Sequence, residues 1–115
     1  MTDQDVTLYG IKTCDTCRKA VRALEAAGRS ITFVDVRATP PSADLLAAWL
    51  ARVGEGLVNT RSTTWRGLQE AERALPPVEV LRAHPTVMKR PVIIAGDAVY
   101  LGWSKPVKAA LLPVS

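Results

Sequence analysis

A strand, helix and strand pattern in the first third of the chain limits the folds that this sequence can adopt. Residues 6–9 favour a strand that ends at Gly10. Residues 17–27 repeat apolar side chains at the spacing of one helical face: Ala20, Val21, Leu24 and Ala27. Gly28 is the expected residue just past the end of that helix, and residues 31–36 favour a second strand. We therefore predict a βαβ unit with parallel strands and a right-handed crossover.

Helical segments are predicted through the middle of the chain. Ser42 is the expected N-cap of a helix. Its buried stripe is predicted to be Leu45, Leu46, Trp49, Leu50 and Val53. The polar, threonine-rich residues 57–66 predict a loop, and residues 67–74 predict a weak helix. A further short helix follows Pro76-Pro77 and is expected to end at His84, because the residue before a proline is pushed out of the α region.

A hairpin and a last helix complete the pattern. Residues 91–95 and 98–101 read as two strands joined by a tight turn at Gly96-Asp97, and residues 105–112 as a helix. The order is β-α-β, then helices, then β-β-α. We predict an α/β thioredoxin-like fold with a helical insertion between the βαβ and ββα halves, built as a single domain over residues 1–115.

Composition restricts the class of protein. The chain has 115 residues, 48% of them hydrophobic and 23% charged, which is ordinary for a globular domain. The first five residues are polar and acidic rather than signal-like, and the apolar runs are too short to span a bilayer, so a cytoplasmic protein that does not bind membranes is expected. The small size and the lack of an extra apolar face predict a monomer.

The charge balance points to small or acidic partners. The net charge is +4 and the pI is about 9.4, but the basic residues are scattered and no run of them alternates with aromatic residues. We therefore expect no nucleic-acid binding, and an anionic small substrate or an acidic protein partner accounts for the excess equally well. One C-x-x-C pair and one histidine offer at most three ligands without zinc-finger spacing, so no metal site is expected.

The residues most suited to chemistry are those of Cys14-Asp15-Thr16-Cys17, where the loop after the first strand becomes a helix. Asp15 or Thr16 is the expected helix cap. Unpaired N–H groups and the helix dipole favour a negative charge there, so a thiolate at Cys14 should have a lowered pKa. Nearby Lys12 and Arg18 should act in the same direction. Cys17 lies inside the helix and could be either redox-active or a packing residue.

Two arginines outside this segment also stand out. Arg61 lies in the loop Val58-Asn59-Thr60-Arg61-Ser62-Thr63-Thr64-Trp65, whose composition is unusually specific for a connector. Arg90 precedes Pro91 at the start of a strand, and thioredoxin folds generally carry a cis-proline there, facing the reactive cysteine. An arbitrary arginine is more often a solvated surface charge.

Taken together, these motifs resemble the arsenate reductase (ArsC)/Spx-like family. They are Leu8-Tyr9-Gly10-Ile11-Lys12-x-Cys14-Asp15-Thr16, Asn59-Thr60-Arg61-Ser62-Thr63-Thr64-Trp65-Arg66, His84-Pro85, Lys89-Arg90-Pro91 and Leu101-Gly102. They occur in the family's order over nearly the whole chain. The sequence is most similar to the YffB-like branch, which is described as glutathione-dependent thiol reductases.

The resemblance implies roles for named residues. Cys14 is the nucleophile, and Arg61 and Arg90 bind an anionic group and lower the thiol pKa. The expected substrate contacts are Lys12, Asp15, Thr16, Arg18 and Pro91. Glutathione is the implied reductant or co-substrate, with glutaredoxin as a possible protein partner and no bound cofactor. Trp103 stands where arsenate reductases of this type have a third arginine, which favours an organic, thiol-containing substrate over arsenate.

Alternatives remain open at this stage. Cys17 could resolve a mixed disulfide at Cys14, or a second glutathione could do so if Cys17 points into the core. Spx-like regulators also carry C-x-x-C, as a redox switch, and bind RNA polymerase, so a redox-controlled binding protein is the rival interpretation. A fold whose thiol has no physiological role is a third.

Overall fold

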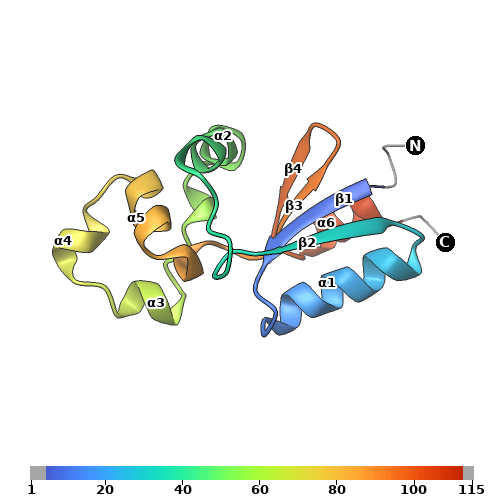
Figure 1. Cartoon of the computed structure of the whole chain (residues 1–115), viewed down its shortest axis with the longest axis horizontal. Coiled ribbons are helices and arrows are strands. Elements are labelled where there is room, and N and C mark those ends of the chain that lie inside the picture. Colours follow the sequence, from blue (N-terminus) through green and yellow to red (C-terminus); the bar gives the residue numbers. More distant parts are fainter. Residues whose placement is uncertain (1–4, 113–115) are drawn as a thin grey trace. The chain divides into compact units, whose positions relative to one another are not determined.

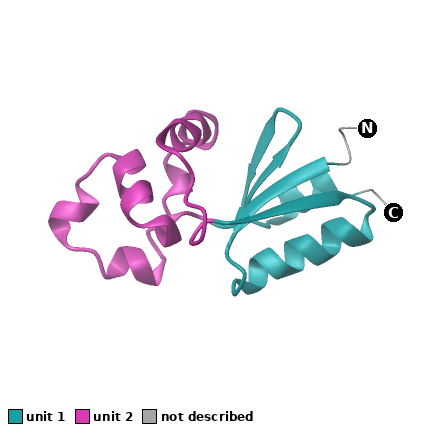
Figure 2. Cartoon of the chain, viewed as in Figure 1, with its two compact units in different colours: residues 1–35, 90–115 teal, residues 36–89 magenta. Residues whose placement is uncertain are grey.

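The computed structural model describes residues 5–112, and the chain divides into two compact units (Figure 1, Figure 2). Unit 1 contains the described parts of residues 1–35 and 90–115, and unit 2 is Val36–Lys89. Unit 1 thus combines the predicted βαβ and ββα halves, and unit 2 corresponds to the predicted helical insertion.

Unit 1 is built on a four-stranded sheet. Its strands are β1 (Asp5–Gly10), β2 (Ser30–Asp35), β3 (Val92–Ala95) and β4 (Ala98–Leu101), in the order β2-β1-β3-β4. β1 and β2 are parallel, as predicted, whereas β3 pairs antiparallel with both β1 and β4. Leu8 at the centre of β1 lies opposite Phe33 on one side and Ile93 on the other. The register also places Gly10 opposite Asp35, so the C-terminal ends of β1 and β2 meet at one edge.

Two helices, α1 (Asp15–Ala26) and α6 (Lys105–Leu111), cover one face of this sheet (Figure 1). Because side chains alternate along a strand, one face of β1 and β3 meets the apolar stripes of both helices. The resulting core cluster consists of Val6, Leu8, Cys17, Ala20, Leu24, Ile93, Val107 and Leu111. Gly28, with φ of 88°, follows α1 as predicted.

Unit 2 is helical. Its elements are α2 (Ala43–Val53), η2 (Gly54–Leu57), α3 (Thr63–Arg66), α4 (Glu70–Arg73), α5 (Pro77–Ala83) and η3 (Pro85–Val87). α2 packs against α5, and α3 against η3. The Ser42 side chain accepts the N–H of Leu45 and caps α2, as predicted, and α5 ends before His84. No helix in the part of the chain between residues 5 and 112 is long and apolar enough to cross a membrane.

The middle of unit 2 corrects the sequence-based prediction. Residues 57–66 are not all loop, because α3 begins within them, and residues 67–74 do not form one helix. The Ser62 hydroxyl accepts the N–H of Trp65 at 3.1 Å and starts α3, and Gly67 is the C-cap of this helix. Gln69 starts α4 by exchanging hydrogen bonds with Glu72 in a capping box. Side-chain caps, rather than an apolar period, define these one-turn helices.

Candidate active site

Cys14 is the N-cap of α1 and lies half-buried at its start. Its backbone is still extended, with ψ of 118°, while its carbonyl already accepts the N–H of Arg18 at 3.0 Å. Its own N–H donates to the carbonyl of Ile11 at 3.0 Å, which closes the turn between β1 and the helix. The prediction that Asp15 or Thr16 caps the helix was therefore wrong: the helix begins at Asp15, and the residue before it is the cysteine.

Cys17 points into the core of unit 1. It is fully buried and shares one helical face with Ala20 and Leu24. Gly10 makes this approach possible, because a Cβ at Gly10 would lie 2.5 Å from the Cys17 sulfur. Only glycine leaves room for the first turn of α1 to pack this closely on the end of β1. The two thiols are nevertheless within hydrogen-bonding reach of each other.

The surroundings of the two thiols shift their pKa values in opposite directions. Burial raises the pKa of Cys14, but the backbone N–H and thiol of Cys17 and the guanidinium of Arg90 stabilise the thiolate, so the net pKa of Cys14 is lowered. Burial raises the pKa of Cys17 from 9.0 to about 12, although a hydrogen bond with the Ile11 backbone acts the other way. At neutral pH the site therefore has one activated thiol and one protonated thiol.

Arg90 and Pro91 enter the site from the start of the ββα half. The Arg90–Pro91 peptide bond is cis, as the thioredoxin-like pattern implied, and Pro91 is buried. The Pro91 carbonyl accepts the N–H of Gly102 at 2.8 Å, which fixes the chain before β3 to the end of β4. Trp103 follows, half-buried against the core cluster, with the Lys108 ammonium 6.0 Å from its ring centroid. That position therefore carries an aromatic ring packed in unit 1.

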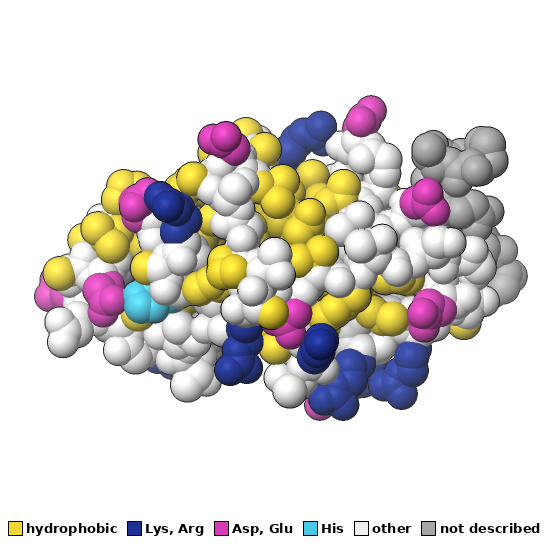
Figure 3. All heavy atoms as spheres, viewed as in Figure 1, with side chains coloured by type: hydrophobic (Ala, Val, Ile, Leu, Met, Phe, Trp, Pro, Cys, Tyr) yellow, Lys and Arg dark blue, Asp and Glu magenta, His cyan; other side chains and the backbone are white. Residues whose placement is uncertain are grey.

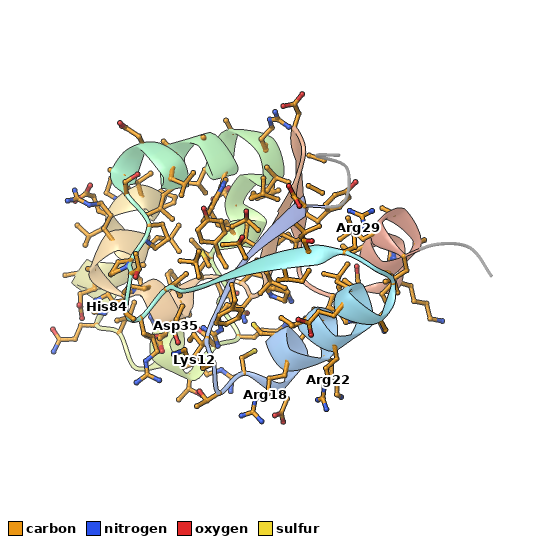
Figure 4. The ribbon with its side chains drawn as sticks, turned by 45° about the vertical axis from the view of Figure 1, so that its right-hand side comes forward. Lys12, Arg18, Arg22, Arg29, Asp35 and His84 are labelled. Carbon is orange, nitrogen blue, oxygen red and sulfur yellow. The ribbon has the colours of Figure 1, made fainter. Side chains whose placement is uncertain are left out.

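The flanking polar residues are exposed and arranged around the turn before α1 (Figure 4). The Arg18 Nε donates to the Lys12 carbonyl at 3.0 Å, while Arg18 Nη1 lies 4.0 Å from the Asp15 carboxylate. The cation that contributes to the lowered pKa of Cys14 is Arg90 rather than these two predicted neighbours. Thr16 is exposed in the first turn of α1.

The sequence analysis missed Asp35. Its Oδ2 accepts the backbone N–H of Lys12 at 3.2 Å and ties the turn after β1 to the end of β2. The signal that could have found it is its place at the C-terminal end of the predicted second strand, residues 31–36, which is parallel to the strand that leads to Cys14. Carboxyl ends of parallel strands meet at one edge, where their side chains serve the same site.

Arg61 belongs to unit 2 and is exposed. Its backbone N–H donates to the Asn59 side chain at 3.1 Å, and the Ser62 hydroxyl donates to the Asn59 carbonyl at 2.7 Å. The N–H of Asn59 in turn donates to the carbonyl of Val87 at 2.8 Å, so this turn is held to η3 within unit 2. The unusual composition of this loop thus supplies the side chains whose hydrogen bonds hold the turn together. Its contribution to the chemistry of Cys14 stays a prediction.

Within the described part of the chain, no group of three or more histidine, cysteine or carboxylate residues is arranged to hold a metal ion. The chemistry that the arrangement offers is that of a thiolate. An activated sulfur is half-exposed at a helix N-terminus, with a guanidinium beside it and a protonated thiol behind it.

Comparison with known proteins places this site in a family. An uncharacterized protein of Haemophilus influenzae is 33% identical over 105 residues, which cover 87% of this chain and 92% of that protein. The global transcriptional regulator Spx of Bacillus subtilis is 29% identical over 94% of this chain and 87% of its own length. Both alignments run over most of this chain.

Solved structures agree with the topology. The structure of the protein YffB has a TM-score of 0.87 and 34% identity, covering 94% of this chain and 99% of its own. An arsenate reductase (ArsC) related protein from Brucella melitensis has a TM-score of 0.72 and 35% identity, covering 91% and 92%. A glutaredoxin from Archaeoglobus fulgidus, at 15% identity and a TM-score of 0.51 over 92% of this chain and 83% of its own, shares the fold alone. The fold is thus thioredoxin-like, as predicted.

The family model for the ArsC family matches residues 9–109, which include Cys14, Cys17, Arg61, Arg90 and Pro91. This match spans the βαβ half, the helical insertion and the ββα half. The chain therefore belongs to the ArsC family.

Proposed function

We propose that this protein is a thiol oxidoreductase in which Cys14 is the nucleophile and glutathione supplies the reducing equivalents. The observation that carries this proposal is the environment of Cys14. Its sulfur is half-exposed, and both Arg90 and the Cys17 backbone N–H favour its ionised form. A thiolate is the reactive form of cysteine, and one with a lowered pKa is populated at neutral pH.

The proposed reaction is thiol–disulfide exchange. The Cys14 thiolate attacks the glutathione sulfur of a mixed disulfide, forms a new S–S bond and expels the other sulfur as a thiolate, which takes a proton from water. A glutathione thiolate then attacks the glutathione sulfur of the Cys14 adduct. This step releases oxidised glutathione and regenerates the Cys14 thiolate. Each turnover thereby converts one substrate mixed disulfide and one glutathione thiol into one substrate thiol and one molecule of oxidised glutathione.

The burial of Cys17 favours glutathione over Cys17 as the resolving thiol. Cys17 is fully buried and, because its pKa is raised to about 12, stays protonated at neutral pH. A protonated thiol attacks a disulfide far more slowly than a thiolate. We propose that Cys17 instead donates a hydrogen bond to the Cys14 thiolate, which makes it a positioning residue.

The substrate is proposed to be an organic disulfide with an anionic group. Arg90 lies beside the reacting sulfur and can pair with a carboxylate in fork geometry, and Arg61 is proposed to do the same. Trp103, packed against the core cluster, supplies no charge where an oxyanion-binding arginine is expected. This supports an organic substrate better than arsenate. Lys12, Asp15, Thr16, Arg18 and Pro91 remain the proposed substrate contacts.

The proposal is tested by intact-mass analysis after incubation with oxidised glutathione. We expect the wild-type protein and Cys17→Ser to gain one glutathione, and Cys14→Ser to gain none. Iodoacetamide labelling of each variant after reduction and denaturation is the control that its one remaining thiol is present. An adduct that persists in Cys14→Ser would remove Cys14 from the mechanism.

A redox switch is the second candidate, because the two thiols are within hydrogen-bonding reach and the chain is similar to Spx. In that case oxidised glutathione yields a protein that lacks two hydrogens and carries no adduct, through a Cys14–Cys17 disulfide. Steady-state turnover with glutathione is then negligible, and retention of RNA polymerase by the immobilised protein becomes the decisive measurement.

A further inference from the structure

A groove of about 340 Å³ lies between α1 and β2, in unit 1, and is lined by Lys12, Arg18, Val21, Arg22 and Phe33. Val21 and Phe33 are half-buried, and both pack against the core cluster, so the groove has a firm apolar floor. The other three lining residues are cations, and none of the five is acidic. The groove therefore combines an apolar surface with concentrated positive charge.

The cations of this groove are held on one side of unit 1. Figure 4 shows Lys12, Arg18 and Arg22 following one another from the turn before α1 along the helix, and Figure 3 shows Lys and Arg side chains gathered at the lower edge, where α1 runs. Arg18 is oriented by its bond to the Lys12 carbonyl.

Two carboxylates lie beside these cations, that of Asp15 in the first turn of α1 and that of Asp35 at the end of β2. The Asp15 side chain is 86% exposed, and its carboxylate lies 4.0 Å from Arg18 Nη1. Such a long, solvated ion pair is weak. Asp35 accepts the backbone N–H of Lys12 and is thereby committed to holding the turn. The lining itself thus carries three positive charges and no negative charge around an apolar floor.

Two of the lining residues flank the segment that carries the reactive thiol. Lys12 is two residues before Cys14, and Arg18 is one helical turn after it. A bare inorganic anion would leave the apolar floor unused, and a purely apolar ligand would leave the cations without partners. The matching chemistry is an apolar side chain between carboxylates. A polypeptide that carries its disulfide a few residues away presents this combination in one segment.

We propose, on the basis of the proposed function, that this groove docks polypeptide substrates whose mixed-disulfide cysteine is preceded by an apolar residue flanked by acidic residues. The apolar side chain lies over Val21 and Phe33, and the carboxylates pair with Arg18 and Arg22. Cys14 attacks the glutathione sulfur of the bound mixed disulfide, and the polypeptide leaves as its thiolate. Docking selects the substrate and does not change the exchange step itself.

The test uses two synthetic peptides that carry glutathione on their cysteine. One is the acetylated amide Glu-Leu-Glu-Gly-Cys-Gly, and the other replaces both Glu by Gln. We expect the full-length protein to react about three- to ten-fold faster with the acidic peptide, because two exposed charge pairs each contribute modestly. In Arg22→Gln we expect this ratio to fall about two- to four-fold. In 0.5 M salt the ratio should approach one, because exposed charges are then screened.

Arg29→Gln is the matched control. It removes the same charge from the turn between α1 and β2, outside the groove, and should leave the ratio unchanged. Equal wild-type rates with both peptides would overturn the docking proposal while Cys14 still reacts with oxidised glutathione. A loss of reaction with every disulfide would instead overturn the proposed function. If Arg22→Gln slows the reaction with oxidised glutathione as much as the reaction with the acidic peptide, the groove binds glutathione itself, and the polypeptide assignment is wrong.

Discussion

Adding one methyl group at Gly10 should measure how tightly α1 is seated on β1. In Gly10→Ala the new Cβ would lie 2.5 Å from the Cys17 Sγ and 3.2 Å from the Cys17 Cβ. Both residues are buried, and non-bonded carbon contacts are comfortable only at about 3.5–4.0 Å, so the start of α1 must move. Overpacking of this kind costs about 1–3 kcal/mol, and the reduced freedom of the unfolded chain returns about 0.4–1 kcal/mol. We expect a net loss of about 1–2 kcal/mol.

The double variant isolates the contact that causes this loss. Cys17→Ala removes the Sγ, so the closest contact left for an added Cβ at Gly10 is the Cys17 Cβ at 3.2 Å. Gly10→Ala should therefore cost about 1 kcal/mol less in the Cys17→Ala background than in the wild type. Urea unfolding followed by tryptophan fluorescence gives all four free energies, since the chain has 3 tryptophans. If the two substitutions are additive within about 0.3 kcal/mol, the proposed packing of α1 on Gly10 is incorrect.

Three further predictions concern ionisation. Arg90→Met removes a hydrogen bond and a positive charge from Cys14, so the midpoint of iodoacetamide alkylation against pH should move upward; an unmoved midpoint would separate Arg90 from the thiol. The raised pKa of Cys17 stabilises the fold below pH 9.0, and this contribution is lost as the pH rises toward about 12. Cys17→Ala should therefore show a shallower alkaline decline of the urea midpoint than the wild type, and equal slopes would contradict the argument. The bond from His84 lowers the pKa of Glu72, which stabilises the fold above the ordinary carboxyl range and is lost in acid. The acid side of the stability profile should therefore flatten in Glu72→Gln, and a profile identical to the wild type would refute this.

The elements of unit 1 could be predicted because each carries its own local signal. The periodic apolar face of α1, the glycine after it and the turn before residue 98 need no tertiary information. The cis bond before Pro91 was predicted from the resemblance to thioredoxin-like proteins. The sequence did not allow prediction of which side chains of one helix or strand contact residues of another. The direction of Cys17 depends on the absence of a side chain at Gly10, and the bond of Asp35 to Lys12 depends on strand register.

The prediction of the short helices of unit 2 was wrong for a different reason. α3 and α4 are too short to show an apolar period, and their sequences are polar. In each helix a side chain accepts a backbone N–H of the first turn. The accepting side chain is that of Ser62 in α3 and that of Gln69 in α4. The composition of the loop around Arg61 marked it as unusual, but it did not indicate that the Asn59 side chain and the backbone of Val87 hold the turn together.

The position of Cys14 as the N-cap of α1 links the charge on its sulfur to the stability of the helix. The side chain of Cys14 makes no ordinary cap hydrogen bond to the first turn of α1. The interaction that it offers the helix N-terminus is therefore the attraction between the thiolate charge and the helix dipole. Converting Cys14 to a mixed disulfide removes that charge and leaves a neutral sulfur at the cap. In the proposed mechanism, each turnover then weakens and restores the first turn of the helix that carries Cys14. Amide hydrogen exchange at the first turn of α1 would consequently report the covalent state of Cys14, with faster exchange in the adduct than in the reduced protein.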